Sequence, residues 1–113
     1  MARGDVPLKS SLSKRPDVTM SEPAASVFAV LVDHEVVVDV RSPYVMLGTL
    51  RAADERYVIL EEADVHDLRD TQTSRELYVL ESRRHGIRAN RRRVLVNRDE
   101  VVCISRLADV VEG

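Results

Sequence analysis

The chain has 113 residues, of which 44% are hydrophobic and 32% charged, and its formal net charge at pH 7 is −2. This length suits one domain and is too short for two, and the apolar share is too high for a wholly disordered chain. A net charge so close to zero excludes a protein that coats nucleic acid by bulk electrostatics, although a local basic patch is compatible with it.

The first 20 residues mix Ser, Lys, Arg, Pro and Asp without helical or strand periodicity. We expect a disordered tail over 1–20, followed by one domain over 21–113. The tail lacks the uninterrupted apolar stretch of a secretory signal, and the sequence has no run of roughly 18 apolar residues that would predict a membrane span. These features predict a cytoplasmic protein with no membrane association.

The domain is expected to begin with a short helix. Ser21 precedes Glu22 and Pro23, which is a typical cap and first turn, and the apolar residues that follow fall on one helical face as far as Val32. The β-branched residues of this segment would also suit a strand.

The rest of the pattern is mostly β. Five short apolar runs predict five strands, at residues 36–41, 44–53, 57–64, 94–97 and 101–105. Three of the connections are short and polar, which favours antiparallel neighbours over parallel crossovers. Gly48 lies inside the second run, where it would permit a sharp bend or a close approach of two backbones.

An insertion over residues 66–93 separates the third and fourth runs. It contains Thr73 followed three residues later by Glu76, which is the capping-box pattern, and Gly86 as a stop. We predict a helix over residues 74–85.

A bent antiparallel sheet of five short strands with a preceding helix describes a small barrel, which would remove its free edges by closing. Two stretches of the sequence resemble the two motifs of the Sm and Sm-like family: Tyr44-Val-Met-Leu-Gly-Thr-Leu-Arg-Ala-Ala-Asp54 with the apolar strand after it, and Val94-Leu-Val-Asn-Arg-Asp-Glu-Val-Val-Cys-Ile-Ser105. The resemblance covers most of residues 22–105, apart from the insertion. It implies an Sm-like five-stranded barrel with an N-terminal helix and a helical insertion between strands 3 and 4.

The resemblance also implies a function. Sm-like proteins form rings of six or seven subunits, in which the fourth strand of one barrel pairs with the fifth strand of its neighbour and RNA lies at the pore. In the family, the RNA pocket uses an Asp and an Asn from the first motif and an Arg-Gly pair from the second. Here Asp54 matches, Tyr57 stands near the Asn position, and Asn97 and Arg98 replace the Arg-Gly pair. Tyr57 could stack on a base, but we favour packing in the core.

The densest charge feature places seven of the 17 Lys and Arg residues between positions 83 and 98. Within it, Arg91, Arg92 and Arg93 are candidates for phosphate contacts together with Arg98. Two other interpretations stay open: a solvated helix end, since cations are favourable there, and a subunit interface with the acidic stretch at residues 61–70.

Nothing in the sequence indicates catalysis, a metal or a cofactor. It has no Gly-rich phosphate loop, nucleophile elbow or zinc-protease motif. His66, Asp67, Asp70 and His85 do not have a specific metal-ligand spacing. Cys103 lies in an apolar run, which predicts a small buried side chain rather than a reactive thiol.

The sequence and the family resemblance together leave two alternative functions. The first is an Sm-like homo-oligomer that binds RNA weakly at a ring surface, through Asp54, Tyr57, Asn97, Arg98 and Arg91 to Arg93. The second is an Sm-like barrel used only for protein–protein assembly, with the insertion as the interface.

Overall fold

The computed structural model describes residues 27–112, and the chain divides into two compact units, Met1–Val30 and Leu31–Gly113. Within the first unit, residues 27–29 are helical and belong to the predicted N-terminal helix. The start of that helix and the expected tail over 1–20 lie outside the described residues. The helix ends earlier than predicted, and turns follow as far as Asp33, which has a φ of 70°.

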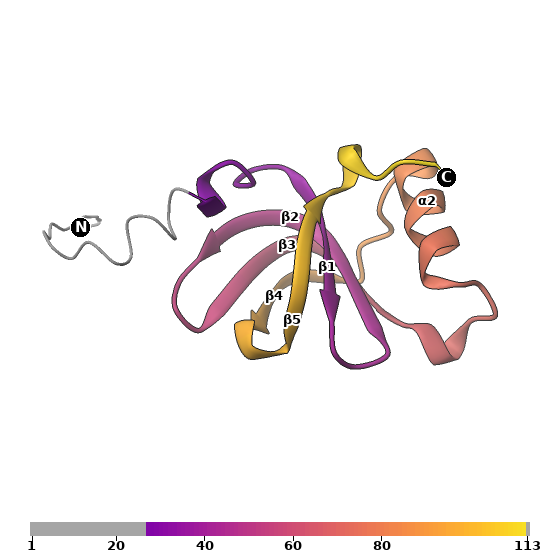
Figure 1. The fold of residues 1–113 in the computed structure, drawn as a ribbon, viewed down its shortest axis with the longest axis horizontal. Helices are drawn as coiled ribbons and strands as arrows, with labels where there is room; N and C mark the ends of the chain where they lie inside the picture. The colour runs from indigo at the N-terminus through magenta and orange to yellow at the C-terminus, as the bar shows by residue number, and fades with distance from the viewer. Residues whose placement is uncertain (1–26, 113) are drawn as a thin grey trace, which may run out of the picture. The chain divides into compact units, whose positions relative to one another are not determined.

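Five antiparallel strands form one bent sheet, as predicted (Figure 1). The strands are β1 Glu35–Val40, β2 Tyr44–Ala53, β3 Tyr57–Asp67, β4 Arg91–Asn97 and β5 Val101–Arg106. The third and fourth strands are longer than predicted, because Asp67 still pairs with Tyr44 and Arg91 with Ala63. The insertion between strands is therefore 68–90 rather than 66–93, and Arg91, Arg92 and Arg93 belong to a strand.

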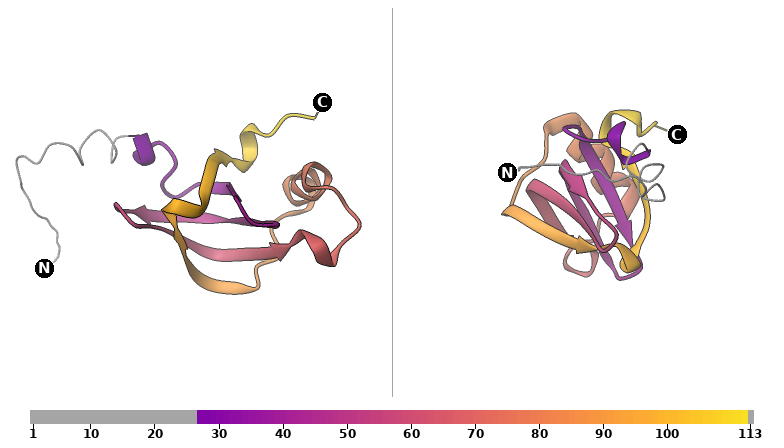
Figure 2. Two further views of the ribbon diagram at one scale, coloured as in Figure 1. Left: turned by 60° about the horizontal axis from the view of Figure 1, so that its bottom comes forward. Right: turned by 90° about the vertical axis from the view of Figure 1, so that its left-hand side faces the viewer.

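The order of strands across the sheet is β4-β3-β2-β1-β5. The sheet curls strongly (Figure 2), and β4 runs into β5 through the short turn η3, Arg98–Glu100. These two strands nevertheless do not pair with each other in the described chain, so the closed barrel that we expected is open within one subunit. Both edges of the sheet keep free backbone groups.

The sheet buries side chains on both of its faces. Val36, Val37 and Val38 follow one another along β1, and each is at most 2% exposed. On the face of Val37, the strand residues Val45 and Leu47 pack against one residue of the insertion helix and one residue of the C-terminal turn η4, Leu107–Asp109. The insertion and the C-terminal segment therefore cover one face of the β1–β2 pair.

The insertion contains the helix α2, Arg75–His85, which agrees with the predicted range. Its cap is Ser74 rather than Thr73: the Ser74 Oγ accepts a hydrogen bond from the backbone N–H of Leu77 at 3.2 Å. Gly86 ends the helix with a φ of 93°. No helix in the described part of the chain is long and apolar enough to cross a membrane.

Gly48 lies where β2 and β3 approach each other most closely. The pairing register shifts between Leu47 and Thr49, and opposite them Glu62 has a φ of 48°, so that β3 bulges. A Cβ atom on Gly48 would stand 3.1 Å from both the Cα and the Cβ of Ala63. The register shift confirms that Gly48 lies at the bend, and the 3.1 Å contacts mean that Ala63 or the Glu61 carbonyl would have to move by a few tenths of an ångström to admit a side chain.

Replacing this glycine should destabilise the fold. We expect Gly48→Val to lower the free energy of unfolding by about 1 to 3 kcal/mol, because its methyl groups would overpack the contact with Ala63. Urea denaturation measures the change. Ala52→Val, at an exposed position of the same strand, is the control and should change stability little. Equal stability of the two variants would contradict a tight contact at Gly48.

Candidate functional site

The residues that the family resemblance singled out meet at one end of the sheet, where the β2–β3 hairpin turns. Asp54 begins the turn, and its Oδ1 accepts hydrogen bonds from the backbone N–H groups of Arg56 and Tyr57, both at 2.8 Å. A carboxylate that accepts two backbone N–H groups in this way fixes the conformation of a tight turn. The Asp54 side chain is therefore directed into its own hairpin.

The β4–β5 connection packs beside this hairpin. The Arg98 backbone N–H donates to the Arg56 carbonyl at 2.8 Å, and its guanidinium donates to the Asp54 carbonyl oxygen. Asn97 lies directly opposite Tyr57 in the β3–β4 register, and its Oδ1 accepts from the backbone N–H of Asp99 at 2.9 Å. Asp54, Tyr57, Asn97 and Arg98 are thus brought together, and three of their four side chains hold the two turns in place.

A pocket of about 320 Å³ opens beside these turns, lined by Glu55, Arg56, Tyr57, Asn97 and Asp99. The Tyr57 side chain is 39% exposed, so our prediction that it packs in the core is wrong. The reason is strand alternation: Val58 and Leu60 of β3 point into the core and are fully buried, so Tyr57 points to the outer face. Its ring is available to a ligand, next to two carboxylates and one guanidinium.

The outer face of the sheet continues from Tyr57 into a chain of ion pairs. Glu61 of β3 accepts from Arg51 of β2 at 2.8 Å and from Arg93 of β4 at 2.7 Å. Hydrogen bonds from Arg51 first, and from Arg93 second, lower the pKa of the Glu61 carboxyl. Arg51 also pairs with Asp33. One of the three predicted β4 arginines is therefore already neutralised within the subunit.

The basic cluster as a whole is divided between two elements. At the end of α2, Arg84 binds Glu112 at 2.7 Å, and the His85 Nε2 lies 3.3 Å from Glu81. On β4, Arg91 donates to the Asn90 carbonyl oxygen. Among the described residues, Arg92 has no ion pair within 4 Å. The cluster is therefore divided between α2 and β4, and each element carries at least one exposed arginine without an ion pair among the described residues, Arg83 on α2 and Arg92 on β4.

The acidic stretch that was a candidate partner surface is also occupied within the subunit. Asp67 binds Arg69 at 2.8 Å, and hydrogen bonds from Arg69 lower the pKa of the Asp67 carboxyl to about 2. Glu61 is held by two arginines, as described above. Asp64 is only 4% exposed and is bonded to the insertion. Glu61, Asp64 and Asp67 are thus bonded within their own chain, whereas Glu62 and Asp70 of the same stretch are exposed.

The bonds of Asp64 form a polar cluster that sequence reasoning missed. The Tyr78 hydroxyl of α2 donates to the Asp64 Oδ2, and the Asn90 Nδ2 donates to its Oδ1 at 3.3 Å. The ring of His66 stacks on Tyr78 with 3.8 Å between centroids. Burial first, and the hydrogen bond to Asp64 second, raise the pKa of Tyr78. This cluster fastens the insertion helix to β3.

Cys103 is exposed, contrary to our prediction, because it lies on the edge strand β5 where no neighbouring strand covers it. Its Sγ donates to the Asp39 Oδ2 at 3.3 Å. Desolvation first, and this hydrogen bond second, raise the pKa of the thiol, which makes it less reactive at neutral pH. Between residues 27 and 112, no group of three or more His, Cys, Asp or Glu side chains is arranged to hold a metal ion.

Two solved structures resemble this fold over most of its length. The Sm protein of Pyrococcus abyssii, solved in complex with a uridine heptamer, matches with a TM-score of 0.50 at 18% identity, over 82% of this chain and 99% of the other. The SmAP1 heptamer of P. aerophilum matches with a TM-score of 0.50 at 20% identity, over 78% of this chain and 92% of the other. The chain has an Sm-like fold. No protein-family model and no curated protein sequence matches the chain.

The Sm-like strand order agrees with the family resemblance, including the short helix before β1 and the helix between β3 and β4. The insertion of this chain is attached at three points, since Tyr78, Asn90 and Val79 all contact the sheet or its core.

Removing the Tyr78 hydroxyl should loosen the insertion. We expect Tyr78→Phe to lower the free energy of unfolding by about 1 to 3 kcal/mol, because the buried Asp64 carboxylate loses a donor. Thermal or urea unfolding measures the loss. Tyr57→Phe is the matched control, because Tyr57 is partly exposed and should tolerate the change.

The pH dependence gives a second readout of the same contact. The pKa of Tyr78 is raised in the folded state. The protonated hydroxyl therefore contributes its full stabilisation of the folded state below the pKa that tyrosine has in the unfolded chain, about 10, and this stabilisation is lost as pH rises through the higher pKa of the folded state. The stability difference between wild type and Tyr78→Phe should therefore narrow only above about pH 10. A difference that narrows already at neutral pH would contradict this assignment.

Proposed function

We propose that this protein is a non-catalytic, Sm-like scaffold that assembles with copies of itself into a ring of six or seven subunits and binds RNA weakly on one surface of the ring. The observation that carries the proposal is the pair of unpaired sheet edges, β4 and β5, at opposite ends of one strongly bent sheet. An edge strand offers its free N–H and C=O groups to any strand that can pair with it.

The side chains at these edges support pairing between subunits. Leu95 on β4 is 52% exposed and Val102 on β5 is 66% exposed. Soluble proteins normally protect an exposed apolar edge with charges, prolines or a covering element. Pairing β4 of one subunit with β5 of the next buries both edges, and a head-to-tail contact of this kind closes into a ring when its rotation permits. The P. aerophilum protein of the same fold is a heptamer.

The exposed ring of Tyr57 and the arginines of β4 support RNA as the ligand. A partly exposed tyrosine beside a pocket suits stacking on an unpaired base. Arg91 and Arg92 extend from the same strand that carries Asn97. The Pyrococcus protein of the same fold was solved with a uridine heptamer. Binding is expected to be weak, because Asp54 and Arg98 are engaged in the turns and two carboxylates line the pocket.

A second candidate function is protein assembly without RNA. It is favoured by the local neutralisation of the basic cluster, in which Arg84 and Arg93 each bind a carboxylate of their own subunit. Under this alternative the ring forms in the same way, but its pocket at Tyr57 has no nucleic-acid ligand. The two candidates agree on assembly and differ on RNA, so they are tested separately.

Assembly should fail when the β5 edge is broken. Val102 has no partner in β1, because the register shifts between the pairs Asp39–Cys103 and Val40–Val101. Val102→Pro removes a backbone N–H donor from β5 at a position that belongs to none of the residue pairs between β5 and β1. We expect the wild type to show a single oligomeric mass by light scattering at micromolar concentration, and Val102→Pro to show the mass of one folded subunit.

The matched control is Val111→Pro, since Val111 is 82% exposed and lies beyond the last strand. It should keep the oligomeric mass. A monomeric wild type, or an oligomer that Val102→Pro leaves intact, would refute assembly through β5.

RNA binding should depend on the β4 arginines. We expect simultaneous replacement of Arg91, Arg92 and Arg93 by Ala to weaken binding of a uridine heptamer and to flatten the log–log salt dependence by roughly 2 to 3 units. Fluorescence titration at two salt concentrations measures both effects. The corresponding triple Lys variant keeps the charge and should keep most of the slope.

The Tyr57 ring is tested in the same titration. Tyr57→Ala should cost about 1 to 3 kcal/mol of binding if the ring stacks on a base, whereas Tyr57→Phe should retain the affinity. An assembled ring with no measurable affinity for the RNA at low salt would reject the RNA function and favour the assembly-only alternative.

A further inference from the structure

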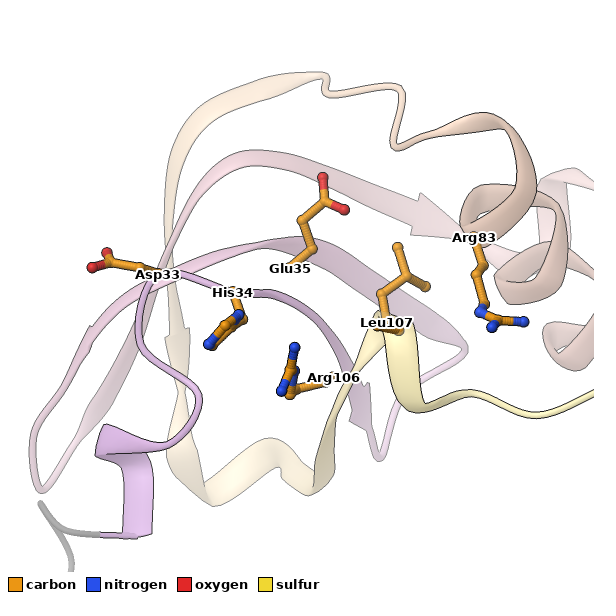
Figure 3. A pocket seen from close by; sticks show the side chains of 7 residues that line it. Asp33, His34, Glu35, Arg83, Arg106 and Leu107 are labelled. Carbon is orange, nitrogen blue, oxygen red and sulfur yellow. The ribbon is translucent and has the colours of Figure 1, made fainter.

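A second cavity, of about 410 Å³, lies away from the surface around Tyr57 and shares no residue with it. It is enclosed by the residues before β1, the end of β5, the turn η4 and the helix α2 (Figure 3). Its lining consists of Asp33, His34, Glu35, Arg83, Arg106, Leu107 and Ala108. The insertion therefore contributes one wall of the cavity through Arg83 of α2.

Arg106 is the central residue of the cavity. Its backbone pairs with Val36, a fully buried residue of β1, so the last position of β5 holds the side chain in a fixed direction. Its Nε is buried and has no hydrogen-bond partner. Leaving a buried guanidinium donor unpaired is costly, and such groups in folded proteins are normally paired with an acceptor. The described part of the chain therefore supplies no acceptor for this donor, and the Arg106 side chain lines the cavity.

The other basic side chains of the cavity are likewise without a carboxylate. In the part of the chain that the structure describes, neither Arg83 nor Arg106 has an ion pair within 4 Å. Glu112 is hydrogen-bonded by Arg84 and also interacts with the charge of Arg83. His34 adds an imidazole beside Arg106 (Figure 3). Two guanidinium groups and one imidazole thus line a single cavity.

The two acidic residues of the lining do not neutralise Arg106. Asp33 forms an ion pair with Arg51 on the outer face of the sheet, and its side chain points away from Arg106 (Figure 3). Glu35 is exposed and has no ion pair with any described arginine. With Asp33 engaged by Arg51, the cavity is lined by two guanidinium groups, one imidazole and the carboxylate of Glu35, none of which has an ion pair among the described residues.

We propose that this cavity binds the phosphate group of a small molecule. A guanidinium offers a planar fork of donors that matches the oxygens of phosphate, and charge-assisted bonds of this type are about twice as strong as neutral ones. Arg106 and His34 bind the anion, and Arg83 contributes positive charge from the other side of Leu107 (Figure 3). The volume lies within the range of about 300 to 1,000 Å³ typical of small-molecule pockets. The cavity shares no residue with the pocket at Tyr57, so its ligand differs from the proposed RNA contact.

Calorimetric titration of the full-length protein tests the proposal, with inorganic phosphate and glycerol 3-phosphate as probes and with chloride at equal ionic strength as the blank. We expect both the wild type and Arg41→Gln to bind at least one probe. Arg41 is an exposed arginine outside the cavity, so Arg41→Gln measures how much the loss of one positive charge anywhere on the protein lowers the affinity for the probe. Arg106→Gln should weaken binding about tenfold or more, because it removes the charge-assisted bonds.

Arg83→Gln provides a second variant at an exposed helix position, should Arg106→Gln disturb the end of β5. Arg83→Gln should also lower the affinity for the probe that the wild type binds, and its circular dichroism spectrum should be unchanged. Tighter binding of glycerol 3-phosphate identifies an organic phosphate as the ligand, and tighter binding of inorganic phosphate identifies the free anion. Two results would overturn the proposal: no binding of either probe above the chloride blank, or equal weakening by Arg41→Gln and Arg106→Gln.

Discussion

The close contact between β2 and β3 at Gly48 is the constraint on which the arrangement of the sheet depends. A Cβ atom at Gly48 would press on Ala63 at 3.1 Å, and the bulge at Glu62, with its φ of 48°, compensates for the shift of register. A bulge increases the local bend and twist of a sheet, which allows so few strands to curl around one core. The curled sheet then ends in two edges that do not pair within the subunit, and the proposed assembly follows from those edges.

The insertion extends this scaffold in one direction. Val79 of α2 enters the core cluster of Val37 and Leu47, and the Tyr78 hydroxyl is bonded to the buried Asp64. Apolar burial and a buried hydrogen bond thus act on consecutive residues of the same helix, one contacting β1 and β2 and the other contacting β3. A helix held at two points in this way has a defined position, which is what places Arg83 on the wall of the cavity around Arg106.

The fold was predictable from local patterns, because apolar runs, short polar connections and a glycine inside a strand each have a local physical meaning. The range of β2 agrees with the prediction, and the boundaries of α2 agree to within one residue. The polar contacts were not predictable in the same way. Tyr78 and Asp64 are 14 residues apart and Arg93 and Glu61 are 32 apart, so their pairing depends on register and on the path of the insertion. Cys103 was misjudged because an apolar run does not reveal that its strand lies at an edge.

The partners that each arginine has within the chain decide which arginines are available to bind an anion. Arg98 is held by backbone oxygens of the hairpin, and moving it would open two turns at once. Arg93 differs, because its partner Glu61 lies on the outer face and also binds Arg51. An exposed pair of this kind contributes only about 0 to 1 kcal/mol, so Arg93 can exchange its carboxylate for a phosphate at little cost. Phosphate contacts of this chain should therefore come from the arginines at the start of β4 rather than from Arg98.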